Sequence, residues 1–94
     1  MLTVIAKIIA KEGKEEEARI ALNALVAPTL IEEGCIDYVL HQSNEDPKVF
    51  FFYENWTSKE SLENHLANVH IAEFSAKADD LLGAPAELYF LSKV

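Results

Sequence analysis

Residues 48–56, KVFFFYENW, form the segment that most limits how this chain can fold. The run is rich in aromatic residues, which predicts a β-strand. Successive side chains of a strand point to opposite faces. One face carries Val49, Phe51 and Tyr53, and the other carries Phe50, Phe52 and Trp56. Since both faces are apolar, the sheet that contains this strand must be covered on both sides.

The rest of the chain predicts three more strands and two helical regions. The strands, which are short and rich in β-branched or aromatic residues, comprise residues 2–10, 35–42 and 86–93. After Gly13, acidic residues are followed by apolar residues at helical spacing, which predicts the first helix. Pro28 is expected to kink this helix or to begin a separate short turn. Gly34 is expected to end the segment as the C′ residue.

The second helical region follows the aromatic strand. Thr57 and Glu60 fit a capping box at its start, and Asn68 is expected to cap a further helical segment. The order β-α-β-β-α-β predicts an α+β, ferredoxin-like single domain over residues 1–94, with four antiparallel strands and the helices on one face. Because the helices cover only that face, we expect a homodimer through sheet-to-sheet packing. Partial cover of the second face by the chain termini is the alternative.

Composition and charge exclude several classes of partner. The chain has 16 acidic and 8 basic residues, a net charge of −8, which argues against binding nucleic acid or anionic lipid. No apolar run approaches the roughly 20 residues that a membrane span needs, and Lys7 interrupts the apolar start. Cys35 is the single cysteine, so no internal disulfide can form. These features predict a cytoplasmic protein.

Three segments of the chain resemble the antibiotic biosynthesis monooxygenase family, which includes small quinol monooxygenases. They are EEGCIDY (32–38), FFFYENW (50–56) and SKESLENHLANVHIAEF (58–74), and the resemblance extends over essentially the whole chain. It implies a ferredoxin-like protomer, a dimeric α+β barrel built from two sheets, and a ligand pocket between sheet and helices. The family also holds haem-degrading enzymes and an isomerase of a phosphorylated signalling sugar, so the fold does not settle the reaction.

His65 is the leading candidate for a catalytic residue. It lies in a helical stripe with Leu62 and Leu66, which we expect to point inward over the sheet. A neutral imidazole can take a phenolic proton, and the resulting anion is electron-rich enough to react with O₂ without metal or flavin. The alternative is a buried histidine that hydrogen-bonds a backbone carbonyl or Glu54.

The remaining candidates come from the aromatic strand and the second helical region. Asn55 shares a strand face with Phe51 and Tyr53, where its amide could bind a substrate carbonyl or a developing oxyanion. Glu54 could pair with His65 or bond across the dimer interface, and the face occupied by His41 is left open. The expected pocket residues are Phe51, Tyr53, Trp56, Leu62, Leu66, His70 and Phe74.

No metal or other cofactor is expected. His65 and His70 are five residues apart, not the three or four that place two ligands on one face of a helix. The leading prediction is a homodimeric monooxygenase that uses O₂ to oxidise a small aromatic quinol without a cofactor. One alternative is a non-catalytic small-molecule-binding or stress-response dimer. Another is an isomerase of a phosphorylated dicarbonyl, for which Lys14 and Lys59 are the obvious phosphate ligands.

Overall fold

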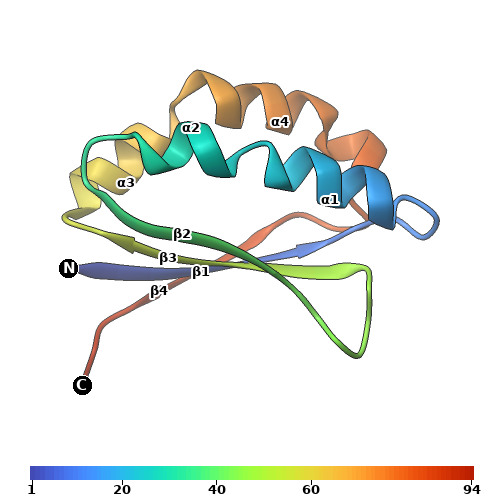
Figure 1. Ribbon diagram of the computed structural model, residues 1–94, viewed down its shortest axis with the longest axis horizontal. Helices are drawn as coiled ribbons and strands as arrows, with labels where there is room; N and C mark the ends of the chain where they lie inside the picture. Colours follow the sequence, from blue (N-terminus) through green and yellow to red (C-terminus); the bar gives the residue numbers. More distant parts are fainter.

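The computed structural model describes all 94 residues, with an antiparallel sheet in one layer and helices in the other (Figure 1). The strands are β1 (Leu2–Ile9), β2 (Cys35–Gln42), β3 (Val49–Trp56) and β4 (Glu87–Leu91). The helices are α1 (Glu15–Asn23), α2 (Val26–Leu30), α3 (Lys59–Leu66) and α4 (Val69–Leu81). This arrangement confirms the predicted α+β, ferredoxin-like fold. None of the helices is long and apolar enough to cross a membrane.

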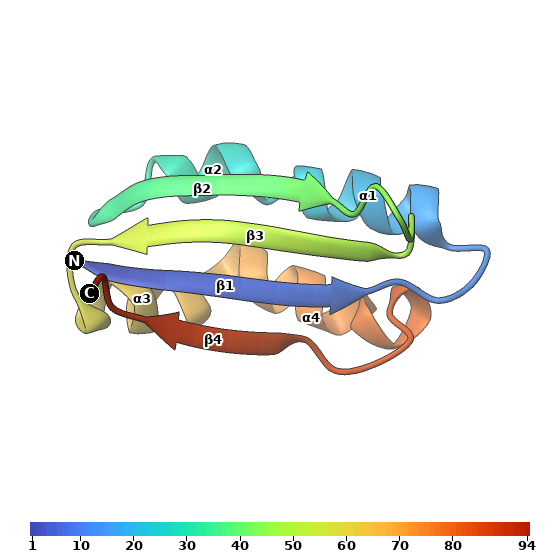
Figure 2. The ribbon, with the colours of Figure 1, turned by 90° about the horizontal axis from the view of Figure 1, so that it is seen from below.

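The sheet has the strand order β2-β3-β1-β4, and every neighbouring pair is antiparallel (Figure 2). All helices lie on one face of the sheet, and the other face is uncovered (Figure 1). The predicted alternation is confirmed in β1, where Val4, Ala6 and Ile8 are buried towards the helices. Their neighbours Ile5 and Lys7 point to the uncovered face and are half-buried.

The first helical region contains two helices, as Pro28 predicted. α1 ends at Asn23, and Pro28 lies in the separate short helix α2. Gly34 does not occupy the C′ position of this region, because the C-cap residue of α2 is Ile31. It lies instead in the turn that leads into β2, with a φ of +86°. A Cβ atom at this position would overlap the side chain of Ser61, so glycine lets the turn lie against the start of α3.

The start of α3 differs from the predicted capping box. The N-cap residue is Ser58, whose Oγ accepts a hydrogen bond from the Ser61 backbone N–H at 3.1 Å. Thr57 instead donates its backbone N–H to the Gly34 carbonyl oxygen at 2.8 Å. This bond ties the end of β3 to the turn before β2, so Thr57 cannot serve as the cap together with Glu60.

The second helical region is broken between α3 and α4. Asn68 caps α4, as predicted, and its Oδ1 accepts a hydrogen bond from the Val69 backbone N–H at 2.7 Å. The break changes the direction of the chain after Ala67, so His65 and His70 lie on different helices (Figure 1). The spacing rule for one continuous helix therefore does not apply to these two histidines.

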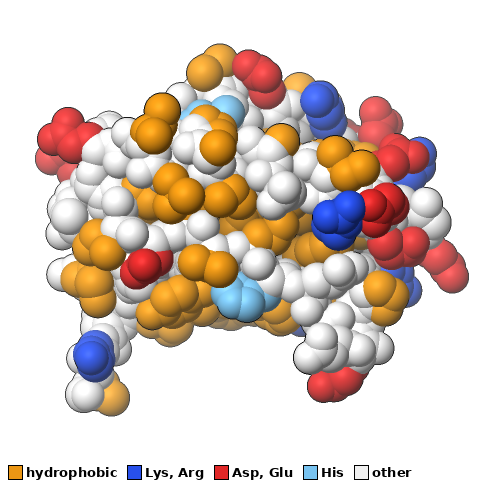
Figure 3. All heavy atoms as spheres, in the orientation of Figure 1, with side chains coloured by type: hydrophobic (Ala, Val, Ile, Leu, Met, Phe, Trp, Pro, Cys, Tyr) orange, Lys and Arg blue, Asp and Glu red, His pale blue; other side chains and the backbone are white.

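The last strand is shorter than predicted and lies at an edge of the sheet. β4 spans Glu87–Leu91, and all five of its residues are exposed. On the uncovered face, Tyr53 of β3 and Tyr89 of β4 are 42% and 47% exposed. Charge is concentrated elsewhere, because acidic side chains gather at the end of the molecule where α1 begins (Figure 3).

Candidate functional site

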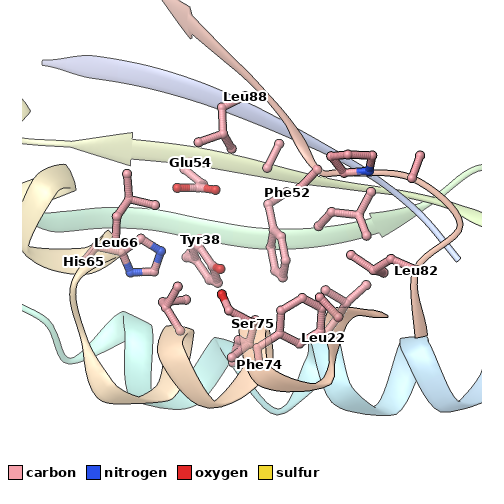
Figure 4. A pocket seen from close by; sticks show the side chains of 18 of the residues that line it. Leu22, Tyr38, Phe52, Glu54, His65, Leu66, Phe74, Ser75, Leu82 and Leu88 are labelled. Atoms are coloured by element: carbon pink, nitrogen blue, oxygen red, sulfur yellow. The ribbon is translucent and has the colours of Figure 1, made fainter. Parts of the chain in front are cut away.

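A cavity of about 600 Å³ lies between the sheet and the helices (Figure 4). Fourteen of its 20 lining residues are hydrophobic, among them Phe52 from β3 and Leu22 from α1. The polar groups at its wall are the hydroxyl of Tyr38, which is one of these fourteen residues, and the side chains of Glu54, His65, Ser75 and Asp79. A mostly apolar cavity with a few convergent polar groups is typical of a site for a small organic molecule.

His65 is held at the cavity wall by a carboxylate. Its Nδ1 lies 2.8 Å from Oε2 of Glu32, and an ionised carboxylate only accepts hydrogen bonds, so Nδ1 carries the proton and donates it. Nε2 has no protein partner. Because no fully buried polar side-chain atom of the chain lacks a partner, Nε2 is open to the cavity. Figure 4 shows the ring beside Tyr38 at this wall.

The protonation of His65 reflects two opposing effects. Burial lowers its pKa below the ordinary value of 6.5, and the hydrogen bond and charge of Glu32 act in the opposite direction. Burial is the larger effect, so the free imidazole is neutral at neutral pH. The site thus presents an unprotonated Nε2 to an apolar cavity, which is the state a general base requires.

Glu32 and His70 complete a cluster that sequence reasoning missed. The same Oε2 of Glu32 lies 2.9 Å from Nε2 of His70, which is also 3.1 Å from the hydroxyl oxygen of Thr29. Separating the two histidines on the basis of their spacing was wrong, because the chain break after α3 brings their rings within 6.0 Å. Glu32 lies between α2 and β2, within the EEGCIDY segment. That segment was the signal available in the sequence.

Aromatic rings support His65 from two sides. Its ring centroid lies 4.7 Å from that of Trp56 and 5.3 Å from that of Tyr38. Trp56 is fully buried behind the cavity wall and does not line the cavity, contrary to prediction. Its Nε1 donates a hydrogen bond to Oε1 of Glu54 at 2.9 Å. Trp56 therefore fixes the positions of both His65 and Glu54.

Glu54 is a second titratable group in the cavity. Burial raises its pKa to about 7, the charge of Glu32 adds to this effect, and the bond from Trp56 opposes it. Only one of its carboxylate oxygens has a protein partner, so the other is open to the cavity by the argument used for His65. Pairing of Glu54 with His65, one of the two alternatives that the sequence left open, does not occur, since the partner of His65 is Glu32.

Three predicted site residues of β3 lie on the face of the sheet opposite to the cavity, so their prediction as site residues was wrong. Phe51, Tyr53 and Asn55 alternate with the cavity residues and point to the uncovered side of the sheet. Asn55 is buried there, where it accepts a hydrogen bond from Thr3 Oγ1 at 2.6 Å and donates one to Asp37 Oδ2 at 2.9 Å. Both polar groups of its amide are thus used within the sheet.

Of the other predicted site residues, some line the cavity and some lie outside its lining. Leu66 and Phe74 line the cavity, whereas Leu62 is buried beside it and His70 lies behind His65, outside the lining. His41, whose face the sequence left open, is exposed on the uncovered side, and its Nδ1 lies 3.1 Å from the Val39 carbonyl oxygen.

The chain is similar to several known proteins over nearly its full length. It is 31% identical over 87 residues to "Uncharacterized protein sll1783" from Synechocystis, covering 93% of this chain and 59% of that protein. It therefore spans less than two thirds of that relative. It is also 30% identical over 88 residues to "Putative monooxygenase YcnE" from Bacillus subtilis, covering 94% of this chain and 93% of that protein.

Solved structures share the fold. The crystal structure of PA3566 from Pseudomonas aeruginosa matches with a TM-score of 0.94 and 36% identity, covering 99% of this chain and 93% of that one. Rv0793 from Mycobacterium tuberculosis matches with a TM-score of 0.91 and 26% identity, covering 99% and 94%. The family description "Antibiotic biosynthesis monooxygenase" matches residues 1–77. The chain belongs to the antibiotic biosynthesis monooxygenase family.

Proposed function

We propose that this protein is a monooxygenase that uses O₂ to oxidise a small aromatic quinol without a cofactor, with His65 as its base. The observation that carries the proposal is the geometry of His65, whose Nδ1 donates to Glu32 while Nε2 is open to an apolar cavity. Family membership and the names of two relatives support a monooxygenase-like role. The quinol is inferred from the apolar walls and the placement of a base among them.

The proposed reaction begins with proton transfer. A quinol hydroxyl donates to Nε2 of His65, and the imidazolium that forms is stabilised by the carboxylate of Glu32. The quinolate then transfers electrons to O₂ and forms a carbon–oxygen bond, giving a ring peroxide anion that takes back the proton from His65 and becomes a hydroperoxide. The oxygenated ring carbon then loses its C–H proton while the O–O bond breaks and the outer oxygen leaves as hydroxide. The proton and the hydroxide together make one water, and a hydroxyquinone remains. One quinol and one O₂ thus give one hydroxyquinone and one water.

Tyr38 takes over the hydrogen-bonding role that was predicted for Asn55. Its side chain lines the cavity, and its hydroxyl oxygen is hydrogen-bonded to the Thr29 side chain. When the Thr29 hydroxyl donates this bond, the O–H of Tyr38 is left to donate to a bound molecule. Burial raises the pKa of Tyr38 above its ordinary value, and the hydroxyl therefore stays protonated. A protonated hydroxyl can donate a hydrogen bond to the second quinol oxygen as negative charge develops on it. Apolar walls exclude the water that would compete for this bond.

The alternative of an isomerase for a phosphorylated substrate has little support. None of the 20 residues that line the cavity is lysine or arginine. Phosphate recognition in an apolar cavity needs such cations or backbone N–H groups at a helix start. The carboxylates of Glu54 and Asp79 at the cavity wall would oppose an anion.

We also propose that the protein is a homodimer that packs through its uncovered sheet face. A row of apolar side chains crosses this face from strand to strand and consists of Val39, Tyr53, Ile5 and Tyr89. Contiguous apolar surface of this kind marks interfaces in proteins that otherwise expose polar groups. The second copy supplies a face of identical chemistry, as a two-fold interface requires.

Oxygen uptake tests the proposed reaction. Protein treated with chelator is mixed with a panel of hydroquinones, and His65→Ala and Asn64→Ala are measured alongside. We expect uptake above the autoxidation rate, a loss of about 100-fold or more in His65→Ala, and no change in Asn64→Ala, whose side chain is exposed on the same helix and does not line the cavity. Absence of uptake, together with thermal stabilisation by a quinol, would replace the oxygenase with a binding protein.

A further inference from the structure

The side of His65 that faces away from the cavity belongs to a cluster of three ligand-type side chains. Glu32, His65 and His70 come from the loop after α2, from α3 and from α4. Their candidate ligand atoms all lie within 4.8 Å of one another. The three side chains are only 9%, 3% and 16% exposed, so the cluster is nearly closed from solvent and is reached past His70.

The donor set and its spacing match the needs of a transition-metal ion. Two imidazoles and one carboxylate are the ligands of many zinc sites that keep a fourth position for water, and of iron oxygenase sites. Metal–ligand bonds of about 2.0–2.1 Å place neighbouring ligand atoms about 2.9–3.4 Å apart. Here Oε2 of Glu32 lies 2.8 Å from Nδ1 of His65 and 2.9 Å from Nε2 of His70. To hold one ion, these two distances would open by a few tenths of an ångström, and the two histidine nitrogens, which lie within 4.8 Å of each other, would come to about 3.4 Å or less.

We propose that Glu32, His65 and His70 form a binding site for one divalent transition-metal ion, for which Zn²⁺ is the probe. The ion would take the place of the proton that now bridges Nδ1 of His65 to the carboxylate of Glu32, since a ligating nitrogen cannot also carry a proton. The site lies behind the catalytic cavity, because Glu32 and His70 do not line it.

The site has a consequence for catalysis that rests on the proposed function. A neutral imidazole carries one proton, and an ion at Nδ1 of His65 forces that proton onto Nε2. The nitrogen that faces the cavity then changes from a proton acceptor to a proton donor. Zn²⁺ would therefore inhibit the oxygenase by switching the tautomer of its base, without entering the substrate cavity.

Calorimetric titration tests the metal site independently of activity. Zn²⁺ is titrated into chelator-treated protein, with His70→Gln and His41→Gln as matched variants. Glutamine at position 70 keeps a polar side chain beside Glu32 but lacks the imidazole ligand, whereas His41 lies on the opposite face of the sheet. We expect one Zn²⁺ per chain in the wild type, binding weaker by about 100-fold or more in His70→Gln, and no change in His41→Gln. Equal affinities in the wild type and His70→Gln, or no stoichiometric binding, would overturn the site.

Oxygen uptake at rising Zn²⁺ concentration then tests the tautomer switch. We expect the wild-type rate to fall in proportion to Zn²⁺ occupancy, while His70→Gln keeps its own zinc-free rate at the same concentrations. Stoichiometric binding with an unchanged wild-type rate would refute the switch and leave the site standing. If metal-free protein shows no uptake with any quinol, the proposed function fails, and the calorimetric result alone decides the metal site.

Discussion

The two faces of one sheet differ sharply in this protein, although both are built from the same strands. On the helix-covered face, a row across the sheet contains Tyr38, Glu54, Val4 and Phe90. The next row on the uncovered face contains Val39, Tyr53, Ile5 and Tyr89. Tyr38 and Glu54 of the covered row line the cavity, whereas the uncovered row contains no carboxyl group and lies on the open side of the sheet.

The comparison shows that the two faces differ in how they hold their buried polar groups, not in whether they carry large apolar side chains. Both carry large apolar side chains, but the covered face buries a carboxyl group, Glu54, whose cost must be offset by a hydrogen bond from Trp56. The buried polar residue of the uncovered face is Asn55, whose amide is hydrogen-bonded to Thr3 and Asp37 on the two adjacent strands. Chemistry is therefore concentrated on the covered face, and the uncovered face is suited to packing.

Replacing adjacent phenylalanines gives the largest expected difference between the faces. Phe52→Ala is expected to lower the free energy of unfolding by about 3–5 kcal/mol, because it leaves a cavity beside the helices. Phe51→Ala, half-buried on the uncovered face, is expected to cost about 1–2 kcal/mol in the monomer.

Urea denaturation at several protein concentrations measures both effects. The cost of Phe52→Ala should not depend on concentration, whereas that of Phe51→Ala should grow as a second copy covers its face. Equal costs that do not depend on concentration would show that the two faces do not differ in this way.

The next largest expected effect is that of Glu54 on how the free energy of unfolding depends on pH. Its pKa is raised from 4.5 to about 7 in the folded chain, so the folded state holds the proton more tightly than the unfolded state. Stability contributed by the protonated form is present below pH 4.5 and is lost as pH rises through 7. At pH 8 the charged form costs about 3 kcal/mol.

Glu54→Gln removes this charge and keeps an oxygen that can accept from Trp56. We expect it to exceed the wild type in free energy of unfolding by up to about 3 kcal/mol at pH 8 and to equal it at pH 4. Urea unfolding at the two pH values measures the difference. Glu63→Gln, on the exposed side of α3, serves as the control. A pH-independent effect of Glu54→Gln would refute the assignment of this group.

The sequence predicts the sheet well but does not identify its covered face. The period of two in residues 48–56 defines two faces, and both are apolar, so nothing in the pattern shows which one the helices cover. Choosing the face of Asn55 for the pocket was therefore arbitrary. Glu54, the one carboxylate among the aromatic residues of this strand, was the clue to the face that the helices cover, because a buried acid in a strand is unusual unless it has a role.

The site was only partly predictable because its key contact is long-range. His65 was found from helical periodicity, which is a local property. Its partner Glu32 lies 33 residues away in a loop, where no periodicity acts. His70 was predicted as a pocket residue, but its grouping with His65 was rejected because the spacing rule assumes a continuous helix, although the predicted cap at Asn68 already indicated a break. Combining these two local predictions would have placed the two histidines together.

A substitution in the proposed dimer interface is expected to weaken the association of the two copies. Tyr53→Lys puts a charge in the centre of the apolar row, which we expect to weaken the dimer by at least about 2 kcal/mol while the fold persists. Sedimentation velocity and circular dichroism measure the two properties. Ile20→Lys is the matched control, because Ile20 is an exposed apolar residue of α1 in the helix layer. A wild-type chain that sediments as a monomer, or a Tyr53→Lys dimer of unchanged affinity, would contradict the interface.

Asn55 gives the smallest expected effect and the sharpest distinction between the faces. Asn55→Ala removes the hydrogen bonds to Thr3 and Asp37, so we expect the free energy of unfolding to fall by about 1–2 kcal/mol. Asn64→Ala, at an exposed position of α3, should change it by no more than about 0.5 kcal/mol. Because the Asn55 amide faces away from the cavity, kcat and KM for oxygen uptake should stay at wild-type values. A fall in kcat with unchanged stability would mean that the uncovered face takes part in the chemistry.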